Sequence, residues 1–384
     1  MYKIIAKTAV NLRVVALYVK TDLLMRKKQI LISTVLLFIC ASLNAQHWKN
    51  PSEKYKDAYK KYIDFTCPIP QDSIRHFVYF SRDRELIINH PLLFSSRFQG
   101  AQIMYSWKQL EPEKGQYNFS IIKEDIAYLN KYGKKLFIQL QDVTFDKRYK
   151  AVPNYLLTNE YDGGAVFQYN DDGKPEGWTA KRWNKKVQER FAMLLMALGN
   201  EFNKKIEGIN LQETAIGVNS KTDSSFSEIT YLQGIKNSMS AVKKAFPDVT
   251  TMIYANFIPG EWLPFNDKGY LKSIYKYGED IGVGLGGPDL MVTRKGQLNH
   301  ALAQMHEGKF TVPLGIAIQD GNYISKTGAD KDYEENKDNG KKDRKNLVPM
   351  LNAFAKYFLK VDYMFWANQK PYFEEDVIPC FSAE

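Results

Sequence analysis

The stretch GINLQETAIG, residues 208–217, joins an apolar run to an acid. Ile209 and Leu211 alternate with small or polar residues, which is the pattern of a short buried strand. Gln212 and Glu213 follow directly, at the start of a loop. The pattern therefore predicts a carboxylate at the C-terminal tip of a strand.

The same alternation of a strand and an amphipathic helix recurs along the chain. The strand-like runs are 76–80, 101–105, 135–140, 208–212, 250–255, 281–285, 312–318 and 363–366. Such alternation over this length favours a single-domain (β/α)8 TIM barrel. An open doubly wound sheet is the alternative, although no glycine-rich phosphate-binding turn follows any of these runs.

Residues 1–45 are expected to lie outside the folded domain. Met25-Arg26-Lys27-Lys28 is basic, an apolar run extends from Gln29 to Ala41, and small residues lead up to Ala45. This order is typical of a secretory signal peptide, so Met25 is the predicted start and residues 46–384 the mature barrel. The apolar run is too short to span a bilayer comfortably. We therefore expect a periplasmic or secreted protein without stable membrane insertion after cleavage.

The charge of the mature chain gives no sign of a polyanionic partner. The formal net charge is +10, and the first 45 residues hold seven basic residues and one acid, so about +4 remains. The segment KYKDAYKKY, residues 54–62, interleaves lysines and aromatic residues. We interpret it as a solvated helix face, because binding of nucleic acid requires a contiguous basic surface.

Two cysteines, Cys67 and Cys380, lie near opposite ends of the mature chain. The chain ends of a closed barrel lie close together, and the cysteines of an exported protein can be oxidised to a disulfide. Their separation in space is not fixed by the sequence, so both a disulfide and two buried thiols stay open. The oligomeric state is also left open.

The loops at the C-terminal ends of the strands build the active site of a (β/α)8 barrel. The predicted tips carry acids, amides and aromatic residues. Carboxylates and amides match sugar hydroxyls, indole rings pack on the apolar faces of pyranoses, and hydrolysis of a glycosidic bond requires two carboxyl groups. The candidate carboxyl groups at these tips include Glu213 and Asp320, and the predicted substrate-binding residues are Trp107, Asp142, Gln212, Asn256, Asp289, Gln319, Tyr323, Trp366 and Asn368.

Other chemistries have little support. None of the five histidines belongs to an HxxxH pair or follows a predicted strand, which argues against a catalytic zinc. There is no GxSxG element for an acyl-transfer serine and no EF-hand spacing for calcium. Neither a metal nor another cofactor is therefore expected.

One segment resembles a known group of enzymes. GAQIMYSWKQLEPEKGQYNFS, residues 100–120, is similar to the strand-two segment of clan A glycoside hydrolases, particularly family 42 β-galactosidases and their family 5-like relatives. The matching positions are Trp107, Leu110-Glu111-Pro112, Gly115 and 117–120, and VPNYLL at 152–157 is also similar. The resemblance is specific only in residues 100–120 and at a few strand tips.

The resemblance implies a retaining mechanism, with Glu213 as the acid/base and Trp366 stacking under the reacting sugar. The expected nucleophile position holds Gln319-Asp320 instead of Glu. Gln212 replaces an Asn, and Gln102 replaces the Arg that holds the nucleophile. These departures suggest a rearranged site, in which Asp289 and Glu261 are alternative second carboxylates.

The sequence thus predicts an exported glycoside hydrolase that cleaves O-glycosidic bonds in an oligosaccharide or polysaccharide. One alternative is a barrel that binds glycan without cleaving it. Another is an inverting hydrolase, whose carboxyl groups lie about 6.5–9.5 Å apart rather than about 5–5.5 Å. The sugar, the linkage and the choice between endo and exo action are not specified.

Overall fold

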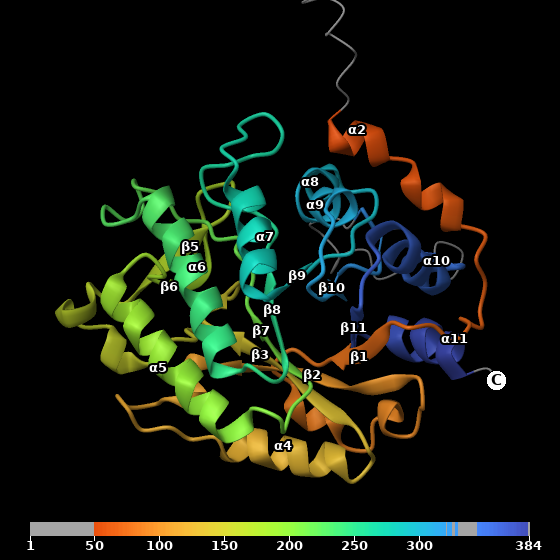
Figure 1. The fold of residues 1–384 in the computed structure, drawn as a ribbon, viewed down its shortest axis with the longest axis horizontal. Coiled ribbons are helices and arrows are strands. Elements are labelled where there is room, and N and C mark those ends of the chain that lie inside the picture. The colour runs from red at the N-terminus through yellow and green to blue at the C-terminus, as the bar shows by residue number, and fades with distance from the viewer. Residues whose placement is uncertain (1–49, 320, 325–326, 329–343, 383–384) are drawn as a thin grey trace, which may run out of the picture. The chain divides into compact units, whose positions relative to one another are not determined.

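The computed structural model describes residues 50–319, 321–324, 327–328 and 344–382. Its centre is a closed barrel of parallel strands in the order β1-β11-β10-β9-β8-β7-β3-β2 (Figure 1). The strands are β1 (Arg75–Tyr79), β2 (Phe98–Ser106), β3 (Lys135–Gln141), β7 (Gly208–Leu211), β8 (Thr250–Tyr254), β9 (Gly284–Gly287), β10 (Leu314–Ile318) and β11 (Tyr363–Ala367). The predicted (β/α)8 barrel is confirmed.

Large rings from several strands fill the base of the barrel. Phe77, Phe137 and Phe365 pack edge to face or tilted, with ring centroids 5.0–5.9 Å apart. The neighbouring strand β7 leaves room for one of them, because a Cβ on Gly208, the register partner of Phe137, would lie 2.7 Å from the Phe137 ring. Large and small side chains therefore alternate across the interior, as close packing of a small barrel requires.

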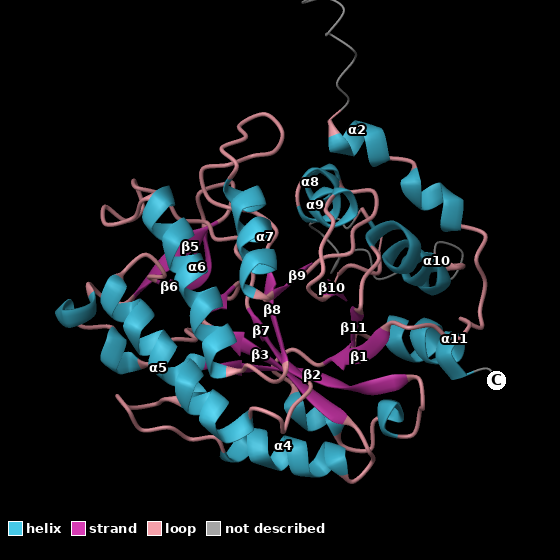
Figure 2. Cartoon of the chain, viewed as in Figure 1, coloured by secondary structure: helices cyan, strands magenta, loops and turns pink. Residues whose placement is uncertain are grey.

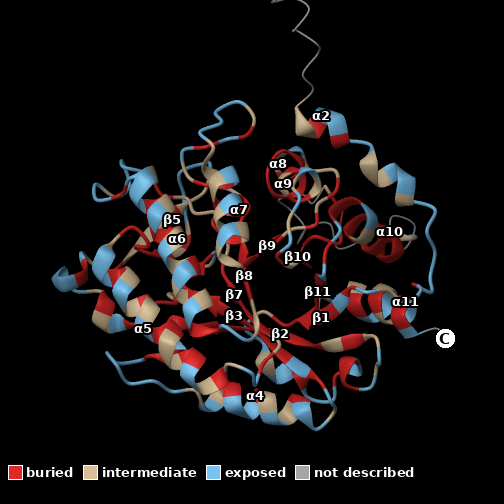
Figure 3. Cartoon of the chain, in the orientation of Figure 1, coloured by how far each residue is buried: buried red, intermediate tan, exposed pale blue. Residues whose placement is uncertain are grey.

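Helices surround the barrel, and the four longest bury one face each (Figures 2 and 3). The principal ones are α4 (Ser120–Asn130), α5 (Lys185–Phe202), α6 (Glu228–Ala245), α7 (Tyr270–Ile281), α8 (Lys295–Asn299), α9 (Ala301–Glu307), α10 (Leu347–Ala353) with the π-helix η7 (Phe354–Leu359), and α11 (Ile378–Ser382). Helix α5 begins where the Asn184 side chain accepts hydrogen bonds from the main-chain N–H groups of Lys186 and Val187. This is the expected role of asparagine at an N-cap.

One predicted strand begins in what is the end of a helix. Residues 281–285 were expected as a strand, but Ile281 is the last residue of α7 and β9 begins at Gly284. Gly282 ends the helix with a φ of 75°, a left-handed conformation that glycine adopts without a steric penalty. The apolar character of 281–283 therefore serves the helix end and its turn.

A small antiparallel sheet between β3 and α5 was not predicted. It has the order β4-β6-β5, with β4 (Val143–Thr144), β5 (Ala165–Tyr169) and β6 (Pro175–Ala180). The β5–β6 hairpin extends beyond the C-terminal end of the barrel strands, and its turn residues line the cavity described below. The sheet thus adds a wall to the functional end of the barrel.

Cys67 and Cys380 form a disulfide, with their Cα atoms 4.7 Å apart. The main-chain N–H of Ile69 also donates to the Cys380 carbonyl over 2.9 Å. The disulfide resolves the choice that the sequence left open. It fastens the segment before β1 to the C-terminal helix α11.

Within the described part of the chain, no helix combines the length and apolar character that crossing a membrane requires. The predicted signal peptide and Asp320 lie outside the described residues.

Candidate active site

Glu213 lies two residues beyond the end of β7, and its half-buried carboxyl accepts a hydrogen bond from a residue that follows β8. The side-chain Nδ2 of Asn256 donates to Glu213 Oε2 over 2.7 Å. Thr214 fixes the adjacent main chain, because its N–H donates to the Tyr254 carbonyl and its Oγ1 accepts from the N–H of Asn256. These contacts place the acid at the mouth of the barrel, as the sequence predicted for its strand.

The Glu213 carboxyl is protonated at neutral pH. Burial raises its pKa from 4.5 to about 8, and the charges of Asp289 and Glu176 act in the same direction. The Asn256 hydrogen bond and the Arg182 guanidinium oppose the rise without cancelling it. A carboxyl group that keeps its proton at neutral pH can act as a general acid.

Asp289, two residues beyond β9, is the second carboxylate of this group. Its Oδ1 accepts from Asn322 Nδ2 over 3.1 Å, and its Oδ2 accepts from Gln297 Nε2 over 3.0 Å. Burial raises its pKa, and these hydrogen bonds and Arg294 act against the rise. Two interacting carboxyl groups on nearby strand tips are the arrangement that separates their pKa values.

Arg182, which lies two residues after β6, holds the main chain at Glu213. Its Nη1 donates to the Glu213 main-chain carbonyl over 2.7 Å, and its Nε and Nη2 donate to the two oxygens of Asp142 over 2.7 and 2.6 Å. Tyr231 donates to the Thr214 carbonyl over 2.7 Å. The sequence did not single out Arg182, because it follows β6 of the unpredicted sheet and no barrel strand.

Several predicted substrate-binding residues have structural partners instead. The Asp142 carboxylate is bound by Arg182, and Gln212 Oε1 accepts from the main-chain N–H groups of Asp142 and Val143 over 3.2 and 2.9 Å. Both Asp142 oxygens and Gln212 Oε1 are thus bound by groups of the protein. Their position at strand tips was predicted correctly, whereas the expected contact with substrate is replaced by support of the loops.

The structure contradicts the predicted sugar contact of Trp107. Its indole is fully buried, packs on Phe191 of α5, and donates from Nε1 to Glu111 Oε2 over 2.9 Å. The other oxygen of Glu111 accepts from the N–H of Gly115 and pairs with Arg190. The Leu-Glu-Pro element therefore stabilises the chain after β2.

The structure also contradicts the predicted sugar platform at Trp366. The indole is fully buried, its Nε1 donates to His76 Nδ1 over 3.2 Å, and its ring packs on Phe381 of α11. Because side chains alternate along β11, Phe365 faces the barrel interior and Trp366 faces the helices. Tyr323 is likewise buried, with its hydroxyl donating to the Ala367 carbonyl over 3.0 Å.

The remaining predicted residues are distributed around the barrel mouth. Asn368 contacts His90 Nε2 through Oδ1 over 3.1 Å, and the N–H of Gln319 donates to Asn322 Oδ1 over 3.3 Å. Both are half-buried, and their contact with substrate stays a prediction. Glu261 caps helix α7, because its carboxylate accepts from the N–H groups of residues 268, 270 and 271. This role leaves it unsuited to be the second catalytic acid.

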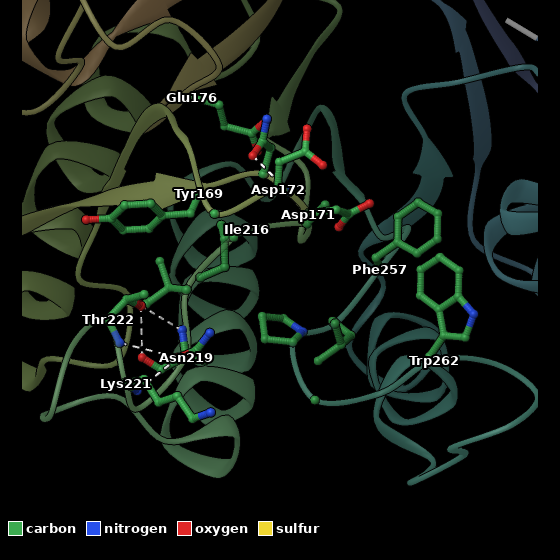
Figure 4. A pocket seen from close by; sticks show the side chains of 18 of the residues that line it. Tyr169, Asp171, Asp172, Glu176, Ile216, Asn219, Lys221, Thr222, Phe257 and Trp262 are labelled. Carbon is green, nitrogen blue, oxygen red and sulfur yellow. Dashed lines mark hydrogen bonds between the residues drawn. The ribbon is translucent and has the colours of Figure 1, made fainter. Parts of the chain in front are cut away.

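A cavity of about 1240 Å³ is lined from Ala215, two residues after Glu213, and from Phe257, directly after Asn256. It is bounded by the β5–β6 hairpin, by residues 215–222 after β7, and by residues 257–262 after β8. Figure 4 shows Phe257 and Trp262 on one side and Tyr169 on the other, with the hairpin carboxylates at one edge. Phe257 and Trp262 are stacked, with centroids 5.6 Å apart and an interplanar angle of 12°.

Buried His300 orients this aromatic pair. Its Nε2 accepts from the main-chain N–H of Leu263 over 3.0 Å, and its Nδ1 lies 2.8 Å from the Gly296 carbonyl and donates to it. Its ring contacts both Phe257 and Trp262, with centroids 4.4 and 5.1 Å away. Burial lowers the pKa of His300 to about 4, so the ring is neutral and keeps this orientation near neutral pH.

No group of three or more His, Cys, Asp or Glu side chains among the described residues is arranged to hold a metal ion.

No protein-family model matches the chain, and no curated protein matches it by sequence. Solved structures with a similar fold include the catalytic domain of β-amylase from Paenibacillus polymyxa, at 8% identity and a TM-score of 0.49 over 78% of this chain and 92% of that one. Endo-glycoceramidase II from Rhodococcus sp. has 8% identity and a TM-score of 0.48 over 79% and 76%. Xylanase 10B from Thermotoga petrophila RKU-1 has 11% identity and a TM-score of 0.46 over 77% and 82%. The barrel assignment itself rests on the strand order.

Proposed function

We propose that this protein is an exported glycoside hydrolase that cleaves O-glycosidic bonds in an oligosaccharide or polysaccharide. The observation that carries the proposal is the position of the Glu213 carboxyl at the tip of β7, held by Asn256, where burial and the charge of Asp289 raise its pKa and the following loop lines an aromatic cavity. A neutral acid can protonate the leaving oxygen, while a second, ionised carboxylate acts on the anomeric carbon directly or through water.

Glu213 is proposed as the proton donor and, after departure of the leaving group, as the base that activates water. Two candidates exist for the second carboxylate. Asp289 is favoured by its charge interaction with Glu213. Asp320 is favoured by its position after β10, where the resemblance to clan A hydrolases places the nucleophile. The retaining mechanism is the expected one, and direct attack by either side chain would produce it.

The test is hydrolysis of a glycan panel by the wild-type protein and by Glu213→Gln. We expect the substitution to reduce kcat by about 10²–10⁴-fold on glycans, where protonation of the leaving oxygen is required. A dinitrophenyl glycoside needs little protonation of its leaving group, so its kcat/KM should fall much less than that of a glycan. The control is Glu189→Gln, an exposed glutamate on α5. Equal turnover by wild type and Glu213→Gln would refute the proposal.

Single Asp289→Asn and Asp320→Asn variants distinguish the two second carboxylates. Loss of the attacking group reduces hydrolysis of the glycan and of the dinitrophenyl glycoside alike. The anomeric configuration of the first product, followed by NMR, separates retention from inversion. Inversion would refute the retaining mechanism while leaving the hydrolase proposal intact.

A glycan-binding barrel without hydrolysis is the second candidate. It is favoured by the side chains at the expected nucleophile position, where Gln319-Asp320 stands in place of Glu. Binding of a glycan by calorimetry, with no product after prolonged incubation, would support this candidate. Any product that depends on Glu213 would exclude it.

Export is supported by the disulfide between Cys67 and Cys380, because disulfides persist mainly in oxidising compartments. The test is expression of the full chain in a Gram-negative host, followed by N-terminal sequencing of the protein in each compartment. We expect a mature protein that begins close to Gln46. An uncleaved cytoplasmic product with reduced cysteines would refute export.

A further inference from the structure

The cavity beside Glu213 is larger than one sugar requires. Its volume is about 1240 Å³, whereas pockets for small molecules measure about 300–1,000 Å³. It lies between the insertion hairpin and the loops that follow β7 and β8. Space of this size and position suits further units of a chain whose scissile bond lies at Glu213.

The loop after β8 gives the cavity an aromatic surface, and this loop begins next to the residue that holds the acid. Phe257 directly follows Asn256, the residue that donates to the Glu213 carboxyl. Trp262 stacks on Phe257 and is 53% exposed, so the indole is both held and accessible. An indole fixed by His300 at the wall of a polar cavity is a preformed surface for the apolar face of a sugar ring.

The opposite edge carries negative charge. Asp171, Asp172 and Glu176 from the β5–β6 hairpin line the cavity, whereas Lys221 is the basic residue among its described lining. Charges of one sign lining a cleft repel ligands of the same sign within about 10 Å at ordinary ionic strength. The cavity therefore discriminates against chains of uronic acids.

We propose that Trp262 and Phe257 form a subsite that binds a sugar unit beyond the scissile bond, and that the substrate is an uncharged glycan chain of several units. This inference rests on the proposed function, because it deepens the description of the same site. The chain spans the cavity from the Glu213 carboxyl to the Trp262 indole. The bound chain consequently extends beyond the scissile bond on the side of the Trp262 subsite.

The test measures binding separately from catalysis, in a Glu213→Gln background. The probes are cellohexaose, xylohexaose, mannohexaose and a galacturonic acid hexamer, by calorimetry. We expect a neutral hexamer to bind and Trp262→Ala to weaken its binding by about tenfold or more, from loss of a buried aromatic contact. Trp262→Phe should restore part of the affinity. The galacturonic acid hexamer should bind more weakly than the neutral one.

Phe265 provides the matched control. It is a 76% exposed aromatic residue of the same loop but does not belong to the described cavity lining. Phe265→Ala should leave binding unchanged. Equal weakening by both alanine variants, no weakening by Trp262→Ala, absence of binding by every neutral hexamer, or tighter binding of the anionic hexamer would each overturn the inference.

Kinetics in the Glu213 wild-type background distinguish this inference from the proposed function. Trp262→Ala should raise KM for the bound hexamer about tenfold and lower kcat/KM for a dinitrophenyl monosaccharide glycoside by a smaller factor. Glu213-dependent hydrolysis that is insensitive to Trp262 would overturn the subsite alone. Trp262-dependent binding without hydrolysis would overturn the hydrolase and retain the subsite.

Discussion

The protonated state of Glu213 has a measurable consequence for stability. Its pKa is about 8 in the folded protein, against an ordinary value of 4.5. The values differ by about 3.5, which at about 1.36 kcal/mol per pKa unit corresponds to at most about 5 kcal/mol. Between pH 4.5 and 8 the folded protein holds a proton that the unfolded chain releases, so stability falls as the pH rises.

Glu213→Gln removes this titration and keeps a side chain of the same size. We expect its free energy of urea unfolding to exceed that of wild type by an amount that grows from pH 4.5 to 8, by about 3–5 kcal/mol in total. The difference should be constant below and above this window. Urea unfolding of both proteins, with the disulfide intact, is followed by circular dichroism at each pH. Parallel pH profiles for wild type and variant would show that Glu213 titrates normally and would refute the reasoning.

Three further predictions follow from the same contacts. Asp289→Asn removes a negative charge beside Glu213, so the alkaline limb of the kcat profile should move to lower pH by about one unit or more. Arg182→Met leaves the Asp142 carboxylate buried without its cation and should lower the free energy of unfolding by about 3–5 kcal/mol, whereas Arg182→Lys should cost less. Cys67→Ser opens the cross-link to α11 and should lower the unfolding free energy by about 2–5 kcal/mol in urea, measured against reduced wild type as a control that should match it.

Much of the barrel follows from local sequence patterns. All eight predicted strand runs overlap a barrel strand, because each is an apolar run buried on both faces. The insertion sheet was missed for a physical reason. Its strand β4 has two residues, and β5 and β6 carry half-exposed residues without a strict alternation. Such strands are stabilised by pairing with one another, which local patterns do not reveal.

The position of a residue at a strand tip could be predicted, but its direction could not. Trp366 is one residue before the end of β11 and faces α11, while Phe365 faces the barrel interior. A shift of one residue reverses the face on which a side chain lies. Because the resemblance supplied a tryptophan near the end of strand eight without its register, the inferred sugar platform was wrong.

The acid itself was easier to predict than the groups that control it. Glu213 is marked by an apolar strand that ends in a carboxylate, whereas Arg182 and Asp289 act on it from 31 and 76 residues away along the chain. Their effects oppose each other, because the cation favours the ionised carboxyl and the anion disfavours it. Burial decides the balance in favour of the proton. Since burial is produced by the barrel and the insertion sheet together, the acidity of Glu213 is a property of the assembled fold.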